Sequence, residues 1–169
     1  MIILQIIWFF LPAYAANMAA SIFKIKFLDR PISEKLFGSH KTYSGFVIGT
    51  ILAILVSILQ KILFQFYFFQ KISILDYSEN FLLIGLLLGF GALFGDTIKS
   101  FFKRRIGIEP GKKWIPFDQI DYTCGAILLS FFLWQPSFGF ILVSIIFNLL
   151  MHILFNYLGF WLGIRKSAW

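Results

Sequence analysis

Long apolar runs, broken by short charged segments, set the pattern of this chain. Residues 1–20 and 138–163 contain no Lys, Arg, Asp or Glu, and residues 44–69 contain only Lys61. Two shorter runs follow the same pattern. An α-helix needs about 20 apolar residues to cross a bilayer. The pattern therefore predicts a single domain over residues 1–169 with five transmembrane helices, at about 1–20, 44–69, 81–98, 119–135 and 138–163.

The composition agrees with an all-α integral membrane protein. Hydrophobic residues make up 59% of the chain and charged residues 14%, whereas soluble domains have about 25% charged residues. These values exclude an ordinary soluble domain and a disordered chain. Since five spans leave no room for a soluble catalytic domain, any chemistry must lie in the helices or the short connections. The first run lacks the preceding basic residues of a signal peptide, so we expect an uncleaved helix.

Basic residues gather on one side of the expected membrane protein. Thirteen of the 15 Lys and Arg residues lie in residues 21–43, in residues 99–117, or in the tail as Arg165 and Lys166. With five spans, these three segments face the same side. Because positive segments stay in the cytoplasm, we expect an outside N-terminus and a cytoplasmic C-terminus in the cell membrane. The net charge of +7 then reflects topology, and we expect no nucleic-acid partner.

The end of the third span carries polar groups that a lipid-facing helix does not need. Asp96, Lys99, Ser100 and Lys103 fall on one face at helical spacing. Ionisable groups near lipid are costly, so they are candidates for function. The alternative is a basic anchor at the lipid headgroups, with Asp96 as its partner. Four glycines in this span form small-xxx-small pairs that predict close helix packing: Gly85, Gly89, Gly91 and Gly95.

Two aspartates open the fourth span. Asp118 and Asp121 are three residues apart, so on a helix they share a face. Neighbouring carboxylates repel one another unless a cation lies between them. Oxygen ligands of this kind suit Mg²⁺, which commonly takes one or two carboxylates together with substrate phosphates. The alternative is helix capping, because Pro116 and early aspartates are ordinary signals of a helix start.

These features together indicate phosphoryl or nucleotidyl transfer. Three aspartates and six basic residues lie within the 26 positions from Asp96 to Asp121, on one side of the membrane. Carboxylates can hold a metal while Lys and Arg bind phosphate oxygens. Lys41 is a further candidate phosphate contact, although the spacing of a Walker motif is absent around it. No Ser/His/Asp or Cys/His set can be assembled from the sequence, which disfavours a covalent acyl mechanism.

The same residues resemble the CDP-archaeol synthase family, which is related to the phosphatidate cytidylyltransferases. The resemblance runs over nearly the whole chain, and its specific part lies between Asp96 and Asp121. The chain departs from the family's usual pattern at Ser39 and Ser44. The matching segments are Leu11–Tyr14, Ala16-Asn17, Leu36–Gly38, His40–Thr42, Gly45, Gly95-Asp96, Ser100-Phe101, Lys103–Arg105, Pro116, Asp118-Gln119, Asp121, Leu162–Arg165 and Trp169.

The resemblance implies a reaction, a fold and a cofactor. In this family an isoprenoid-ether glycerol phosphate attacks the α-phosphate of CTP, pyrophosphate leaves, and the product is a CDP-activated lipid for phospholipid synthesis. The family's fold has five transmembrane helices and a polar cavity open to the cytoplasm, and Mg²⁺ is required. We expect Asp96, Asp118 and Asp121 to bind Mg²⁺ and to form the catalytic set with Lys103 and Arg104. Residues expected to bind CTP or to close its pocket are Asn17, His40, Lys41, Lys99, Ser100, Arg105, Lys113 and Gln119.

Alternatives remain open from the sequence. A phosphatidate cytidylyltransferase would act on diacyl lipid, and the spans do not distinguish the two kinds of chain. A non-enzymatic transport or assembly subunit would use the charges only as anchors. The CDP-alcohol phosphotransferases also use membrane aspartates, but their long aspartate motif is absent from the sequence. The role of Asn17 is open between a structural contact and a nucleotide contact, and the sequence does not indicate an oligomeric state.

Overall fold

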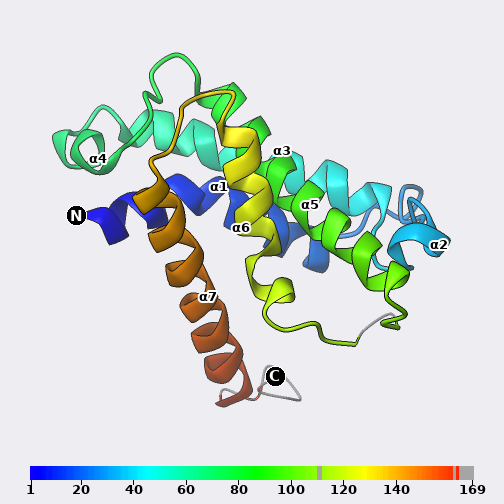
Figure 1. The fold of residues 1–169 in the computed structure, drawn as a ribbon. Coiled ribbons are helices and arrows are strands. Elements are labelled where there is room, and N and C mark those ends of the chain that lie inside the picture. The colour runs from blue at the N-terminus through cyan, green and yellow to red at the C-terminus, as the bar shows by residue number, and fades with distance from the viewer. Residues whose placement is uncertain (110–111, 162, 164–169) are drawn as a thin grey trace.

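The protein is a bundle of helices with short connections (Figure 1). The structure is a computed structural model, and it describes residues 1–109, 112–161 and 163. In these residues, β pairing is limited to one isolated antiparallel bridge between Pro31 and Thr42. The helices are α1 (Ile2–Ile22), α2 (Glu34–Phe37), α3 (Tyr43–Leu63), α4 (Tyr67–Ile72), α5 (Phe81–Arg105), α6 (Phe117–Ser130) and α7 (Phe138–Trp161).

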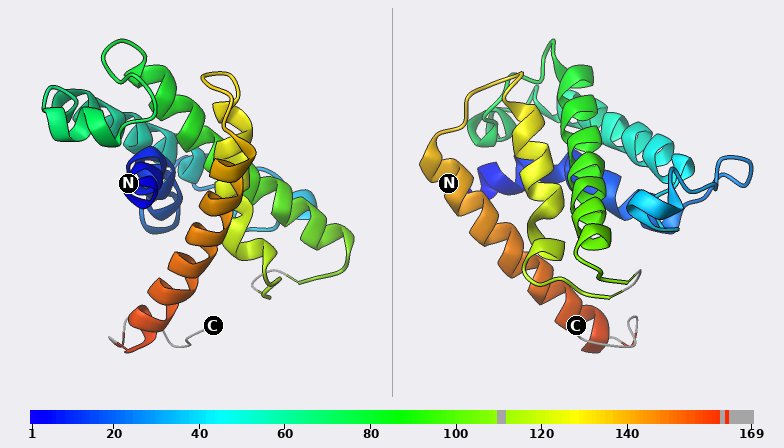
Figure 2. Two further views of the ribbon diagram at one scale, coloured as in Figure 1. Left: turned by 60° about the vertical axis from the view of Figure 1, so that its left-hand side comes forward. Right: turned by 45° about the vertical axis from the view of Figure 1, so that its right-hand side comes forward.

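Helices α1, α3 and α5 pack against one another and form the centre of the bundle, and α6 packs along α5. Helix α7 contacts α6 and then diverges from the other helices (Figure 2). The connection between α1 and α3, which includes α2, lies beside the C-terminal half of α5 (Figure 1). The short helix α4 lies at the opposite end of the bundle.

Pro12 lies inside α1 and removes one backbone hydrogen bond from this helix. Since proline has no N–H, the carbonyl of Trp8 loses its usual partner four residues later. The side chain of Gln60, from α3, donates to this carbonyl at 2.6 Å. Gln60 is only 1% exposed. A buried amide on α3 thus satisfies the carbonyl that the proline leaves free, as an apolar environment requires.

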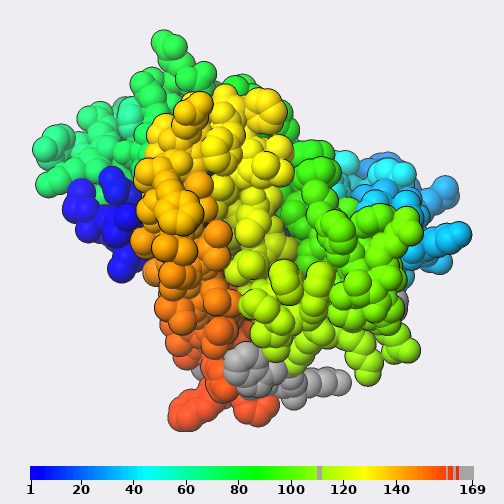
Figure 3. All heavy atoms as spheres, in the orientation of Figure 1, coloured from blue at the N-terminus to red at the C-terminus, as the bar shows by residue number. Residues whose placement is uncertain are grey.

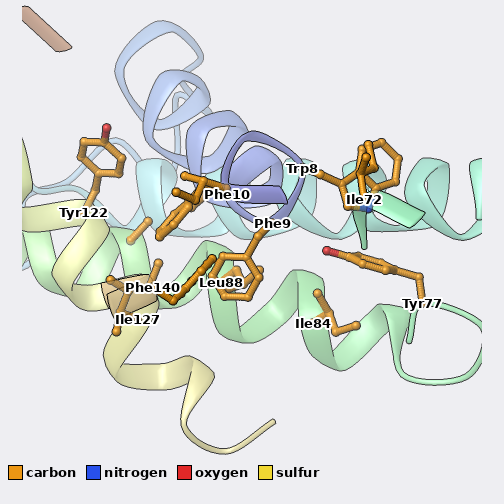
Figure 4. Close-up of a cluster of buried hydrophobic side chains, with 14 residues drawn as sticks. Trp8, Phe9, Phe10, Ile72, Tyr77, Ile84, Leu88, Tyr122, Ile127 and Phe140 are labelled. Atoms are coloured by element: carbon orange, nitrogen blue, oxygen red, sulfur yellow. The ribbon is translucent and has the colours of Figure 1, made fainter. Parts of the chain in front are cut away.

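Aromatic side chains fill the core between α1, α5 and α7 (Figure 4). Phe9 and Phe10 of α1 are 1% and 0% exposed, and the rings of Phe9 and Phe140 meet edge to face at 5.6 Å between centroids. Trp8 packs on Phe69 near α4, with ring centroids 4.8 Å apart. Aromatic pairs in these geometries add to the stabilisation from buried area.

Four helices are long and apolar enough to cross a membrane: Ile2–Ile22, Tyr43–Leu63, Phe81–Arg105 and Phe138–Leu158. The fifth predicted span, at 119–135, is the 14-residue helix α6, which ends at Ser130. Such a helix is about 21 Å long, which is less than the roughly 30 Å of a bilayer core. The all-helical membrane architecture is confirmed, whereas a fifth full-length apolar helix is not found in the described residues.

Two helices differ in length from the predicted spans. The expected helix over 44–69 ends at Leu63, and the chain turns before α4. The side chain of Gln70 donates to the carbonyl of Phe64 at 2.9 Å across this turn, while Tyr67 stays 77% exposed. Aromatic and amide residues of this kind favour a membrane interface over the bilayer core. In the other direction, α5 continues to Arg105, because basic residues in a last turn stabilise a helix end.

Glycines let α5 and α6 cross with their backbones in contact. A Cβ on Gly91 would lie 2.7 Å from the carbonyl oxygen of Gly125, and a Cβ on Gly125 would lie 2.7 Å from the Cα of Gly95. On another face of α5, a Cβ on Gly85 would lie 2.9 Å from the Cα of Ile54 in α3. The close packing predicted from the glycine spacing is confirmed. Asp96 and Asp121 lie next to this crossing.

Replacing Gly125 with alanine should destabilise the protein, because the added methyl group meets backbone that cannot move aside. We expect the free energy of unfolding to fall by about 1–3 kcal/mol, the usual cost of overpacking. Denaturant unfolding in detergent would measure it. Gly139→Ala in α7 is the matched control, since a Cβ there meets nothing within 4 Å. Equal stability of the two variants would contradict the close crossing.

Candidate active site

The C-terminal half of α5 presents the polar face that the sequence predicts. Asp96, Lys99 and Lys103 are at helical spacing along it. The Lys103 side chain is 8% exposed, and the Lys99 side chain is 14% exposed. The hydroxyl of Ser100 donates to the backbone carbonyl of Asp96 at 2.8 Å. Three ionisable groups are therefore held inside the bundle and do not extend into solvent.

The first turns of α6 bring two more carboxylates to this face. The backbone N–H of Trp114 donates to Asp118 Oδ2 at 2.5 Å, and the N–H of Asp118 donates to the Trp114 carbonyl at 2.9 Å. Asp121 Oδ1 accepts from the N–H of Tyr122 at 2.6 Å. Each aspartate therefore has one oxygen held by a backbone N–H, and its other oxygen is directed at α5. Asp118 Oδ2 contacts α5 as well, through Lys103.

Lys99 joins all three aspartates. Its Nζ lies 3.1 Å from Asp96 Oδ1, 2.8 Å from Asp118 Oδ1 and 2.9 Å from Asp121 Oδ2. The Asp121 side chain is only 5% exposed. In such a setting, carboxylates without a cation between them would repel one another strongly. The Lys99 ammonium group therefore holds the three acidic groups together.

Two more lysines complete the arrangement. Lys41, just before α3, forms an ion pair with Asp96 Oδ2. Lys103 Nζ lies 3.0 and 3.1 Å from the two carboxylate oxygens of Asp118, and it also donates to the backbone carbonyl of Lys112. We call this set the Asp–Lys cluster, with three negative and three positive groups: Asp96, Asp118, Asp121, Lys41, Lys99 and Lys103.

A polar pocket of about 470 Å³ lies beside the Asp–Lys cluster. It is formed by the end of α1, the connection before α3, the start of α3 and one face of α5. Asn17, His40, Lys41 and Asp96 line it. Its size is within the range of small-molecule sites. The connection is held partly by Ser44, whose buried hydroxyl accepts from the N–H of Ile25 at 2.7 Å.

Three other predicted residues, Arg105, Lys113 and Gln119, are not among the six members of the Asp–Lys cluster. The guanidinium of Arg105 lies 5.1 Å from the centre of the Phe101 ring, and the residue is exposed. Lys113 is exposed in the connection after α5, and Gln119 is buried at the start of α6. Of the predicted CTP-binding residues, Lys41 and Lys99 lie in the cluster, and Asn17 and His40 lie on the pocket wall.

Among the predicted catalytic residues, Arg104 has buried side-chain nitrogen atoms without a hydrogen-bond partner in the described part of the chain. Its Nε and Nη1 atoms are buried, and they have no hydrogen-bond partner among the described residues. Buried polar groups are normally satisfied, and a buried charge normally has a counter-charge. An arginine in this condition is suited to binding an anionic group such as phosphate.

The Asp–Lys cluster also bears on the expected metal. Within the described part of the chain, no group of three or more His, Cys, Asp or Glu side chains is arranged to hold a metal ion. However, three carboxylates converge on a single cationic group, the Lys99 ammonium. These oxygen donors are of the type that Mg²⁺ prefers. The donor set therefore fits Mg²⁺ chemically, provided that Lys99 turns away.

Three features of the site were not predicted from the sequence. The Trp114 N–H and the Lys112 carbonyl hold Asp118 and Lys103, but backbone groups in a connection leave no pattern in a sequence. Gly125 sets the spacing between α5 and α6. Its small size was a usable signal, because a glycine four residues after Asp121 matches the glycine spacing of α5.

The pKa of Asp118 should make stability depend on acid pH. Burial tends to raise the pKa of this carboxyl, but hydrogen bonds from Lys99 and from the Trp114 N–H outweigh it, so the pKa lies below its ordinary value. Because the pKa of Asp118 is lower in the folded protein than in the unfolded chain, where it is about 4, the ionised carboxylate stabilises the fold at pH values above 4. This stabilisation is lost as the pH falls from about 4 through the lower pKa of the folded state. The melting-temperature difference between the wild-type protein and Asp118→Asn should therefore shrink from pH 6 towards pH 3. A constant difference would contradict this.

Comparison with known proteins places this site in a family. All of residues 1–169 match the family model described as CarS-like, CDP-archaeol synthase. The chain belongs to the CDP-archaeol synthase family. A CDP-archaeol synthase of Methanocaldococcus jannaschii is 31% identical over 171 residues, which cover 96% of this chain and 95% of the relative. One of Staphylothermus marinus is 34% identical over 176 residues, which cover 96% and 93%.

A solved structure supports the fold of this CDP-archaeol synthase family member. That structure is described as an intramembrane enzyme for archaeal membrane lipids biosynthesis. It superimposes with a TM-score of 0.73 and 24% identity, over 89% of this chain and 91% of the other. With the four apolar helices, this establishes an integral membrane protein. The family predicted from the sequence motifs is thus confirmed.

Proposed function

We propose that this CDP-archaeol synthase family member transfers the cytidylyl group of CTP to an isoprenoid-ether glycerol phosphate and releases pyrophosphate. The observation that carries the proposal is the buried Asp–Lys cluster beside a polar pocket at the end of α5. A headgroup anchor does not need three carboxylates collected around one lysine. Nucleotidyl transfer does need groups of both signs, held in place where charge develops.

We place CTP in the polar pocket. Asn17 and His40 would contact it from the pocket wall, and Lys41 would turn from Asp96 to the triphosphate. Arg104 does not line this pocket, but its buried nitrogen atoms lack partners among the described residues, and a phosphate oxygen could accept hydrogen bonds from them. Lys99 and Lys103 would likewise exchange carboxylate oxygens for phosphate oxygens.

Asp96, Asp118 and Asp121, whose oxygens converge on the Lys99 ammonium, would hold Mg²⁺. The chemistry that Mg²⁺ supplies when bound is neutralisation of charge on the triphosphate. The chain itself positions both reactants and excludes water. One oxygen of the lipid phosphate forms a bond to the α-phosphorus, while the bond from that phosphorus to the β-bridging oxygen breaks. The lipid phosphate is already anionic near neutral pH, so no strong general base is required.

We also propose five crossings, with the N-terminus outside and the site facing the cytoplasm. Ion pairs from Lys41 to Asp96 and from Lys103 to Asp118 support this topology, because they link the two basic connections at one end of the bundle. Helix α6 would complete its crossing with the turns after Ser130. Arg165 and Lys166, used in the sequence argument, lie outside the described residues. In sealed vesicles of known orientation, an impermeant maleimide should label Glu79→Cys from the outside and Lys112→Cys from the inside, both built on Cys124→Ser.

The function can be tested directly with purified protein in detergent. Labelled CTP and Mg²⁺ would be supplied with digeranylgeranylglyceryl phosphate in one tube and with phosphatidate in another. We expect labelled lipid mainly in the first tube. Faster labelling of phosphatidate would replace the proposed substrate with diacyl lipid. Folded protein that labels neither lipid and binds no CTP would overturn the enzymatic assignment in favour of a non-catalytic membrane role.

A further inference from the structure

An apolar groove of about 440 Å³ runs between α5 and α6. Figure 3 looks onto the side of the molecule where these two helices are exposed next to each other. Many of its walls are exposed apolar side chains; Phe102 is 51% exposed and Leu128 is 54% exposed. At one point the groove meets the Asp–Lys cluster, because Lys99 and Asp121 line it. The apolar walls include Phe94, Ile98, Phe102, Phe117, Ile120 and Leu128.

The groove and the polar pocket lie on opposite faces of α5. Leu93 and Asp96 line the pocket, whereas Phe94, Ile98 and Phe102 line the groove. Since an α-helix turns by about 100° per residue, these two sets point roughly 160° apart. The Asp–Lys cluster lies between them, with Asp96 reaching the pocket and with Lys99 and Asp121 reaching the groove.

We infer that this groove holds a hydrocarbon chain of the lipid phosphate, whose headgroup meets the Asp–Lys cluster from the side opposite the nucleotide. The inference rests on the proposed function. Phosphoryl transfer requires the attacking and leaving oxygens to be roughly in line. With the triphosphate on the pocket side, the attacking oxygen must approach from the other side, which is where the groove opens. The ammonium of Lys99 at that point suits an anionic headgroup, and the aromatic walls suit a branched hydrocarbon.

A second crevice, of about 690 Å³, lies between α1, α6 and α7, and it is the competing site. Its walls include hydrogen-bonding groups: Tyr14 donates to Asn148 in this region, and His152 shares a hydrogen bond with Asn156. It meets the polar pocket at Asn17, which lines both. A lipid in this crevice would therefore arrive on the nucleotide's own side, which is unfavourable for an in-line attack.

The single cysteine of the chain provides the test, because Cys124 lines the groove and is exposed. Purified protein would be treated with methyl methanethiosulfonate, with and without digeranylgeranylglyceryl phosphate. The matched reporter is Met151→Cys in a Cys124→Ser background, which places a lone thiol in the competing crevice. We expect the lipid phosphate to slow the rate of thiol modification at position 124 by about tenfold. Position 151 should keep its rate. Digeranylgeranylglycerol, which lacks the phosphate, should protect position 124 far less.

Protection at position 151, or at neither position, would overturn the inference. Transfer of label from CTP to the lipid, measured on the same preparations, tests the proposed function separately from the proposed lipid groove. Labelled lipid without protection at 124 would mean that the function holds and the groove is wrong. A second variant, Cys124→Trp, narrows the groove from an exposed position. It should raise the KM for the lipid about tenfold and leave the KM for CTP unchanged, and equal changes in both would contradict a lipid groove.

Discussion

Replacing Asp121 with asparagine should abolish cytidylyl transfer while leaving the fold intact. In the wild-type protein, the N–H of Tyr122 donates to Asp121 Oδ1 at 2.6 Å. The side-chain oxygen of asparagine can accept the same hydrogen bond, so the start of α6 should keep its geometry. What is lost is the charge that faces Lys99 and the substrate phosphates. Removing one preorganised electrostatic group from an active site typically costs about a hundred- to a thousandfold in rate. We expect Asp121 to be at the upper end, because it pairs with Lys99 and is a proposed Mg²⁺ ligand. The measurement is the initial rate of lipid labelling at saturating CTP and Mg²⁺.

Asp76→Asn is the matched control for this variant. Asp76 is exposed in the connection between α4 and α5, where it accepts from the N–H of Ser78 at 2.8 Å. The same chemical change there should leave the transfer rate within about twofold of the wild-type rate. Near-normal transfer by Asp121→Asn in Mg²⁺ would show that the metal assignment is wrong.

Replacing Lys99 with methionine should produce the largest loss of stability among single substitutions in the site. The variant keeps an apolar side chain of similar length but removes the cation shared by Asp96, Asp118 and Asp121. Breaking a buried ion pair by removing one partner costs about 3–5 kcal/mol, because the remaining charge is left uncompensated. We therefore expect a clear fall in melting temperature in metal-free buffer, together with loss of transfer.

Two controls separate charge from packing in this variant. Lys99→Arg retains the positive charge and should recover most of the stability. Lys71→Met makes the same change at an exposed position in the last turn of α4 and should have little effect. Added Mg²⁺ should stabilise Lys99→Met more than the wild-type protein, since Asp121 loses its ion pair while Asp96 and Asp118 keep theirs with Lys41 and Lys103. Equal stabilisation of both proteins by Mg²⁺ would contradict binding of the metal by these carboxylates.

The general plan of the site could be predicted from the sequence. Helical spacing predicted that Asp96, Lys99 and Lys103 share one face. The predicted topology put Asp118 and Asp121 on the same side of the membrane as that face. The spacing of residues along a helix predicts which side chains share a face, but it does not predict the distances between side chains of different helices. The sequence therefore did not indicate that Lys99 lies within ion-pair distance of three carboxylates, or that Arg105 points to Phe101.

The helix boundaries show the same limit in the fold. Hydrophobic runs located the four described helices that are long and apolar enough to cross a membrane, because burial in lipid and burial in protein both select apolar residues. They could not show that the chain turns after Leu63 or that α6 stops at Ser130, since apolar residues continue past both points. In each case the end depends on local hydrogen bonds, such as that from Gln70 to the Phe64 carbonyl.

The hydrogen bond between Gln60 and the Trp8 carbonyl has a consequence for biosynthesis. While α1 is alone in the bilayer, Pro12 leaves the Trp8 carbonyl without a donor, and no water is present there to replace one. The donor arrives only when α3 has been synthesised and has entered the membrane. The first helix should therefore remain beside the insertion machinery, or at the wet interface, until its partner emerges, so that the two enter the lipid as a pair.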